Sequence, residues 1–213
     1  MTGWPKFLFF TLIVRPLVLV VLGLNIRHRE RLPGAGPSIV VANHNSHLDT
    51  LVLMSLFPLG QLHRLRPVAA ADYFMRNPLL AWFATRVIGI IPIRRNNQNN
   101  HQDPLAPVHA ALERGDIVII FPEGTRGEPE RMQQFKSGII HLAKAHATAP
   151  ITPVFLHGLG KALPRGEGLL VPFFCDVFVG PPLHWTGDRH QLMQQLTQQM
   201  ERLAAEKGDA AWD

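Results

Sequence analysis

A histidine and an aspartate stand close together where an apolar run in the sequence stops. His44 and Asp49 are five positions apart and directly follow the β-branched run Ser38–Ala42. An imidazole can take up a proton near neutral pH, and a carboxylate on its second ring nitrogen fixes the tautomer and stabilises the imidazolium. This pairing of a base with a group that orients it recurs on unrelated folds. The stretch is therefore the first candidate for a catalytic site.

Two simpler interpretations of the same stretch stay open. Ser46 and Asp49 are spaced as in a capping box, in which Ser46 is the N-cap and Asp49 only helps to start a helix. His44 and His47 are spaced like half of a metal site, but the sequence shows no second cluster of ligand residues to complete it. We therefore expect no metal, and interpret His47 as a residue at the helix start.

A second group of polar residues also follows an apolar run. The run Ile117–Phe121 leads into Pro122-Glu123-Gly124-Thr125-Arg126. Backbone donors left free by a glycine turn, together with a guanidinium that can bind two phosphate oxygens, form a site for an anion. On this pattern alone the stretch could also be a turn with a salt bridge.

The spacing of apolar residues predicts strands that alternate with helices. Strands are expected over residues 38–42, 67–71, 117–121, 149–155 and 169–179, the last bent at Pro172. Helices are expected over residues 48–57, 72–86, 104–114, 138–146 and 189–207. Both candidate sites then follow strands, and the ends of parallel strands are where ligands usually bind in α/β proteins.

Length and composition fit one domain with anionic partners. The chain has 213 residues, of which 46% are hydrophobic and 17% charged, and its net charge is +5. This is apolar for a soluble protein, so we expect part of the surface to contact a membrane. The basic residues are spread singly without interleaved aromatic residues, so we expect no nucleic acid. The single cysteine, Cys175, excludes an internal disulfide and is interpreted as a core residue.

The N-terminal stretch Phe7–Leu24 is nearly long enough to cross a bilayer, but Arg15 and Pro16 interrupt its centre. An arginine there costs about 2.5 to 3.5 kcal/mol on insertion scales, and proline removes a helix hydrogen bond. We therefore expect two short apolar helices that dip into one leaflet. A buried amphipathic hairpin is the alternative.

A basic cluster and a turn-rich joint follow this stretch. Arg27, Arg29 and Arg31 favour the cytoplasmic face and could hold anionic head groups, and no cleavage site for a signal peptide is present. The joint is rich in proline and glycine. We therefore expect a membrane-associating helical segment over residues 1–30 and a catalytic domain over residues 31–213, on the cytoplasmic face of the inner membrane.

In their order, these motifs resemble those of the glycerolipid acyltransferase superfamily, and of its 1-acylglycerol-3-phosphate acyltransferases in particular. Residues 43–49 fit the first signature, NHxSxxD, and residues 121–127 fit FPEGTRS with glycine in place of the final serine. The segment from Gly89 to Arg95 fits the second block, GxxxxxR, with Arg94 where an acid is common. Residues 135–138 fit FKxG, and residues 149–155 fit the fourth block.

The resemblance implies a fold and the roles of particular residues. The expected fold is a single α/β domain with a mixed, largely parallel β-sheet flanked by helices, behind the N-terminal segment. His44 would be the general base, oriented by Asp49, that takes the proton from an acceptor hydroxyl as this attacks an acyl thioester. Glu123 would orient Arg126 or a glycerol hydroxyl. The residues expected to bind the acceptor's glycerol phosphate are Arg95, Glu123, Gly124, Thr125, Arg126 and Lys136.

The implied reaction moves a fatty acyl group from acyl-CoA or acyl carrier protein to lysophosphatidate, without a metal or redox cofactor. Partners would be the lipid bilayer, the lysophospholipid acceptor and the acyl donor. Three alternatives stay open: another acceptor, such as glycerol 3-phosphate or a lyso-aminolipid; a non-catalytic lipid-binding module; and a metal-dependent phosphoesterase that uses His44 and His47.

Overall fold

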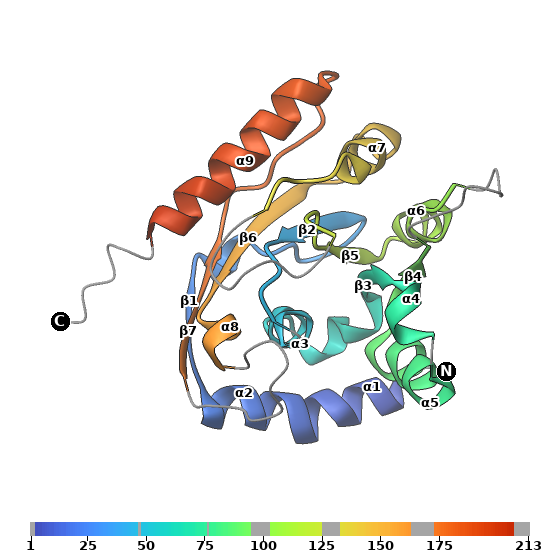
Figure 1. The fold of residues 1–213 in the computed structure, drawn as a ribbon, viewed down its shortest axis with the longest axis vertical. Coiled ribbons are helices and arrows are strands. Elements are labelled where there is room, and N and C mark those ends of the chain that lie inside the picture. The colour runs from blue at the N-terminus through green and yellow to red at the C-terminus, as the bar shows by residue number, and fades with distance from the viewer. Residues whose placement is uncertain are drawn as a thin grey trace.

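One sheet organises the part of the chain that the computed structural model describes, which is residues 3–46, 48–75, 77–94, 103–124, 133–162 and 173–206. Its seven strands lie between two layers of helices (Figure 1). The strands are β1 (Leu22–Arg27), β2 (Ser38–Ala42), β3 (Leu65–Ala70), β4 (Ile91–Ile93), β5 (Ile117–Ile120), β6 (Ile151–His157) and β7 (Phe173–Val179). The helices are α1 (Trp4–Phe9), α2 (Arg15–Val21), α3 (Asp49–Ser55), α4 (Ala71–Phe74), α5 (Pro78–Trp82), α6 (Ala106–Glu113), α7 (Gly138–Ala145), α8 (Leu159–Ala162) and α9 (Arg189–Ala205).

The strand order is β1-β7-β6-β2-β5-β3-β4. The five strands from β6 to β4 are parallel to one another, β7 is antiparallel to β6, and β1 is parallel to β7. The expected mixed, largely parallel sheet is therefore confirmed. Strands β2 and β5 lie inside it and are buried on both faces, which explains their uninterrupted β-branched sequences.

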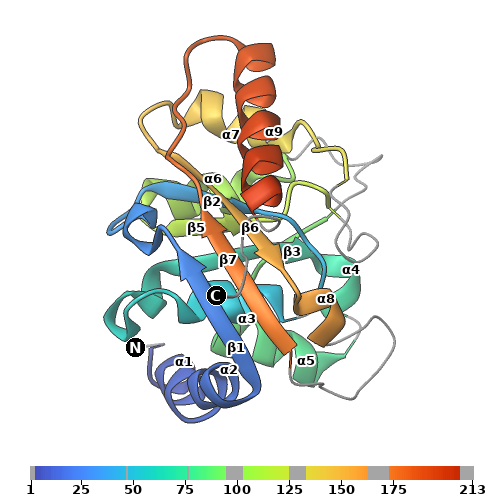
Figure 2. The ribbon, with the colours of Figure 1, turned by 90° about the vertical axis from the view of Figure 1, so that its left-hand side faces the viewer.

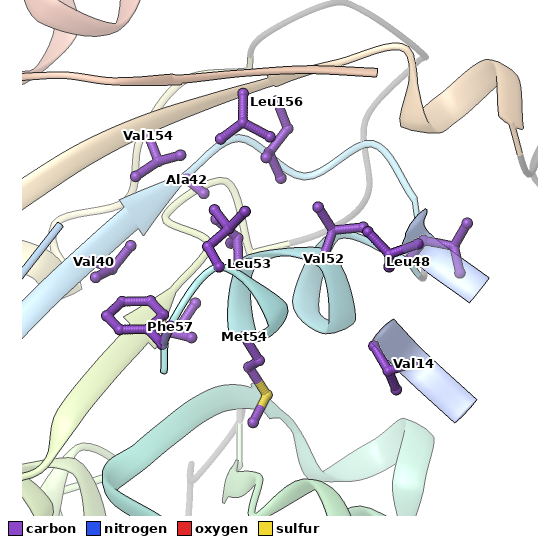
Figure 3. Close-up of a cluster of buried hydrophobic side chains, with 14 of the residues drawn as sticks. Val14, Val40, Ala42, Leu48, Val52, Leu53, Met54, Phe57, Val154 and Leu156 are labelled. Carbon is purple, nitrogen blue, oxygen red and sulfur yellow. The ribbon is translucent and has the colours of Figure 1, made fainter. Parts of the chain in front are cut away.

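Each face of the sheet has its own layer of helices. Helix α3 lies on one face, and the N-terminal helix covers α3 from outside, whereas α6, α7 and α9 cover the other face (Figure 1). Figure 3 shows Leu53 of α3 pointing toward Ala42 and Leu156 of the sheet, while Met54 points away from it. The amphipathic helix expected over 189–207 is confirmed as α9, which buries Leu192, Leu196, Met200 and Leu203.

The N-terminal apolar stretch is one continuous helix from Trp4 to Val21, so the expected pair of short helices is wrong. A π-helical segment, Phe10–Val14, joins α1 to α2 just before Pro16. Its wider turn accommodates the proline, which lacks an N–H and would clash in a regular helix. The Arg15 side chain turns back onto the protein, where its Nη2 donates a 2.9 Å hydrogen bond to the carbonyl of Phe57.

The helix passes directly into β1, a strand that the sequence analysis does not anticipate. β1 pairs with β7 from Leu22↔Phe173 to Arg27↔Phe178. The proposed division at residue 30 therefore leaves one strand of the main sheet in the N-terminal segment. Two of the arginines that follow bind backbone carbonyls, Arg29 that of Leu56 and Arg31 that of Val179.

The long helix expected over residues 72–86 is also wrong. The chain forms α4, then α5, then a π-helical segment, Phe83–Ile88. Asn77 has an extended backbone and caps α5, since its side chain accepts hydrogen bonds from the Leu79 and Leu80 amides. Pro78 at the first position cannot continue a preceding helix, which explains the interruption. The bend expected at Pro172 lies outside the described residues.

Candidate active site

The two candidate stretches leave the sheet at the same edge. β2 and β5 are parallel neighbours whose pairing runs to Val41↔Ile120, and β2 also pairs with β6 up to Ala42↔Val154. The loop over residues 43–49 and the turn over residues 121–124 therefore start side by side. Both lie at the C-terminal ends of parallel strands, as the sequence predicts.

His44 and Asp49 form the expected pair. His44 Nδ1 lies 2.9 Å from Asp49 Oδ2, and the same oxygen accepts hydrogen bonds from the backbone amides of Asn45 (2.6 Å) and Ser46 (2.8 Å). The Asp49 side chain is 0% exposed, whereas that of His44 is 21% exposed. With Nδ1 directed at the carboxylate, Nε2 is the ring nitrogen left to exchange a proton with a substrate.

The capping-box contacts expected between Ser46 and Asp49 are present in part. Asp49 Oδ2 accepts from the backbone amide of Ser46 (2.8 Å), and Ser46 Oγ accepts from the amide of Leu48 (3.3 Å), but α3 itself begins at Asp49, with Leu48 as its N-cap. Asp49 therefore closes the turn before the helix and also binds the ring of His44. Burial raises the pKa of Asp49, and the hydrogen bonds from His44, Ser46 and Asn45 oppose that rise because they stabilise the carboxylate.

Asn43 anchors this loop to the sheet, a role that the sequence analysis misses. Its Nδ2 donates to the carbonyl of Leu156 (2.9 Å), and its Oδ1 accepts from the amide of the same residue (2.7 Å). The side-chain amide thus continues the β2–β6 pairing one residue beyond the strand. The only signal in the sequence is an amide side chain directly after a buried strand, and this does not identify the partner.

Glu123 lies against the His44 loop. Its side chain is buried, at 2% exposure, and Oε1 accepts a 3.3 Å hydrogen bond from the His44 backbone amide. Burial is the main cause that raises the pKa of Glu123 to about 7, with a smaller contribution from the charge of Asp49, against hydrogen bonds from the backbones of His44 and Gln133. The expected contact of Glu123 with Arg126 stays a prediction.

Gly124 and Lys136 are also brought together at this edge. Gly124 has φ +73°, a conformation that favours glycine, and its amide closes the turn on the carbonyl of Phe121 at 3.0 Å. A methyl group on Gly124 would lie 2.7 Å from Lys136 Nζ. The lysine side chain therefore crosses directly over the turn, where its ammonium can meet an anion.

The structure thus places His44, Asp49, Glu123, Gly124 and Lys136 at one edge of the sheet. Four other residues considered from the sequence lie outside the described residues: His47, Arg95, Thr125 and Arg126. The expected phosphate-binding roles of Arg95, Thr125 and Arg126 stay predictions.

Comparison with proteins of known sequence finds relatives that share one enzyme name. The chain is 32% identical over 163 residues to the chloroplastic 1-acyl-sn-glycerol-3-phosphate acyltransferase LPAT1 of Arabidopsis thaliana. The matched segment is 76% of this chain and 44% of the relative. The chain is also 30% identical over 167 residues to the human 1-acyl-sn-glycerol-3-phosphate acyltransferase alpha, covering 77% and 56%. The chain therefore spans about half the length of these relatives.

A solved structure and a protein family match as well. The fold resembles that of the 1-acyl-sn-glycerophosphate (LPA) acyltransferase PlsC from Thermotoga maritima, with a TM-score of 0.76 over 98% of this chain and 80% of that one, at 20% identity. The family match covers residues 23–157 and so includes both loops of the site. Since this is more than half of the chain, the protein belongs to the Acyltransferase family.

Proposed function

We propose that the protein transfers a fatty acyl group from the thioester of acyl-CoA or acyl carrier protein to the free hydroxyl of lysophosphatidate, which gives phosphatidate for phospholipid synthesis. The observation that carries this proposal is the 2.9 Å contact between His44 Nδ1 and the buried carboxylate of Asp49, at the edge of the sheet where ligands bind. The names of the relatives support lysophosphatidate as the acceptor.

In this reaction His44 Nε2 takes the proton from the acceptor hydroxyl as its oxygen attacks the thioester carbonyl carbon. A C–O bond forms, and the tetrahedral intermediate then breaks its C–S bond. The imidazolium returns the proton to the departing sulfur, so the products are phosphatidate and a free thiol. Asp49 stabilises the imidazolium between these steps. As proposed, the reaction needs neither a metal nor a redox cofactor.

The turn after β5 would hold the acceptor's phosphate. Lys136 supplies a cation over Gly124, and Arg95, Thr125 and Arg126 would add further donors. Holding the phosphate there would keep the free hydroxyl near His44, and such positioning lowers the barrier by several kcal/mol, up to about 7 to 11 kcal/mol in the best cases.

The apolar outer face of the N-terminal helix supports a membrane location. The helix buries Phe10, Val14 and Val18, yet Leu12 is 67% exposed and Val20 is 83% exposed. Figure 2 shows α1, α2 and α5 together at the end of the molecule where β1 and β7 begin. Because β7 is antiparallel to β6, this is also the end that carries His44. We propose that this face lies in the cytoplasmic leaflet of the inner membrane, from which the lipid acceptor reaches the site.

The test is the release of free thiol from long-chain acyl-CoA by the purified protein in detergent. Release should require lysophosphatidate and disappear in His44→Ala, whereas the matched variant of an exposed histidine, His63→Ala, should keep it. Release without an acceptor would indicate a thioesterase. If acyl transfer occurs only with glycerol 3-phosphate or a lyso-aminolipid, the acceptor is different. If no acceptor and no carrier-protein donor supports release, the protein is a lipid-binding module.

A separate experiment tests the membrane location. The double variant Leu12→Asp/Val20→Asp should lose its sedimentation with phosphatidylglycerol vesicles, because it places two charges on the exposed face. Binding that the double variant keeps in full would contradict the proposal.

A further inference from the structure

The turn after β5 touches the proposed catalytic base at two points. The ring of Phe121 stacks on the imidazole of His44, with ring centroids 4.3 Å apart and an angle of 25° between the planes. Two residues further on, Glu123 Oε1 accepts the hydrogen bond of the His44 backbone amide. Neither contact is a step in the reaction proposed above.

The contacts with Phe121 and Glu123 restrict motions of the His44 ring that the hydrogen bond to Asp49 alone would allow. Asp49 holds one atom at the edge of the imidazole, and a single hydrogen bond allows the ring to tilt about the line between the two atoms. Phe121 covers one face of the ring and so sets its plane. Glu123 holds the backbone from which the side chain of His44 starts. Together, the three contacts determine where Nε2 lies.

The surroundings of Glu123 are consistent with a role in holding the loop. It is buried, and it accepts hydrogen bonds from the backbones of His44 and Gln133. The carboxylate is close enough to Asp49 for the negative charge of Asp49 to raise the pKa of Glu123. Two buried carboxyl groups therefore bind the His44 residue, one at the ring and one at the backbone.

We propose that Phe121 and Glu123 are positioning residues for His44, so that the turn after β5 orients the base in addition to its part in the acceptor site. This inference rests on the proposed function in so far as His44 is taken to be the base. It predicts that substitutions at these two positions lower kcat, rather than weaken the binding of lysophosphatidate.

The first experiment compares Phe121→Leu, which keeps an apolar side chain but removes the ring face, with Phe121→Tyr, which keeps the ring. Phe121→Leu should lower kcat by about 10- to 100-fold and leave KM for lysophosphatidate within about threefold, since a shift of about 1 Å at a reacting group costs about 100-fold. Phe121→Tyr should keep most of kcat. The control Phe155→Leu makes the same change in the core on the opposite face of the sheet and should alter only the thermal unfolding temperature.

Glu123→Ala tests the second contact, because it removes the oxygen that accepts the His44 hydrogen bond, whereas the matched variant Glu123→Gln keeps an acceptor there and should retain most of kcat. The alanine variant should lower kcat by less than Phe121→Leu does, with KM for lysophosphatidate again within about threefold. A KM that rises more than tenfold at unchanged kcat would assign Glu123 to the acceptor and overturn its positioning role.

A measurement without acyl transfer separates this inference from the proposed function. The rate at which diethyl pyrocarbonate modifies His44 is followed by mass spectrometry of the peptide that contains it. The rate should rise several-fold in Phe121→Leu, where one face of the ring is uncovered, and stay at the wild-type value in Phe121→Tyr and Phe155→Leu. If Phe121→Leu changes neither the rate nor kcat, the inference is overturned. If the wild type transfers no acyl group, the proposed function fails, yet the modification rates still decide how His44 is held.

Discussion

The loop after β2 and the turn after β5 leave neighbouring strands at one edge of the sheet, yet they are built differently. In the first loop the polar side chains turn inward: Asn43, Asn45, Ser46 and Asp49 are all buried, and Asp49 and Asn43 bind backbone groups. In the turn after β5, Glu123 is buried as well, but a left-handed glycine brings the backbone under Lys136, whose side chain is exposed.

This difference follows from the proposed roles of the two regions, since the loop after β2 would hold the base and the turn after β5 would bind the phosphate. A base must keep one geometry, and buried hydrogen bonds to backbone groups hold it there. A phosphate must enter from solvent or lipid, so the cation that meets it stays accessible. Substitutions in the loop after β2 should therefore lower kcat, and substitutions of the exposed groups after β5 should raise KM for the acceptor.

The largest effect is expected from Asp49→Asn. The side chain keeps its size and can keep an oxygen where Asp49 Oδ2 accepts from the amides of Asn45 and Ser46, but it loses the charge that stabilises the imidazolium. We expect kcat to fall by about 10²- to 10⁴-fold. The thiol-release assay measures this, and the double variant with His44→Ala should be no slower than His44→Ala alone. More than a third of wild-type kcat in Asp49→Asn would contradict the role of the pair.

Lys136→Met should act on binding instead. It removes the cation over Gly124, so KM for lysophosphatidate should rise by about tenfold, the equivalent of one charge-assisted hydrogen bond, at nearly constant kcat. The control is Lys144→Met, an equally exposed lysine on α7, which should leave both constants unchanged. An equal loss of kcat in Lys136→Met would place this lysine in the catalytic step and weaken the contrast between the two regions.

Gly124→Ala separates the backbone conformation of the turn from its contact with Lys136. Gly124 (φ +73°) and Gly187 (φ +96°) both lie in the left-handed region, but only at Gly124 would the new methyl group meet the lysine. Both alanine variants should lose about 1 to 2 kcal/mol of unfolding free energy in chemical denaturation. Only Gly124→Ala should also raise KM, by a few-fold, because it displaces Lys136. An equal KM in the two variants would show that the position of the lysine does not matter.

The smallest expected effect is a dependence of stability on pH. Burial raises the pKa of Glu123 from its ordinary value of 4.5 to about 7 in the folded protein. Between these pH values the folded state keeps a proton that the unfolded chain has released, so this carboxyl lowers the free energy of unfolding as the pH rises from 4.5 to 7. Glu123→Gln lacks this contribution. The unfolding free energy of the wild type minus that of the variant should therefore fall across this range, and a flat or rising difference would show that folding does not raise the pKa of Glu123.

Much of the fold could be predicted from local patterns. The strands over 38–42 and 117–120 and the helix over 189–205 follow from runs and spacings within each segment. The predictions of the N-terminal helices and of β1 failed because residues far away in the sequence determine the local structure there. Arg15 is tolerated in an apolar helix because the carbonyl of Phe57 accepts its hydrogen bond, and Leu22–Arg27 is a strand because β7 lies beside it.

The sequence by itself determined that a histidine and an aspartate follow a buried strand closely enough to meet, because the five-residue separation keeps both in one short loop. Only the tertiary structure decided what holds that loop: Leu156 against Asn43, Phe121 against the ring of His44, and Glu123 against its backbone. These partners are 113 and 79 residues away in the hydrogen-bonded cases. They meet because of the strand order and register of the sheet, which arise from the packing of the whole chain and not from the residues of either segment alone.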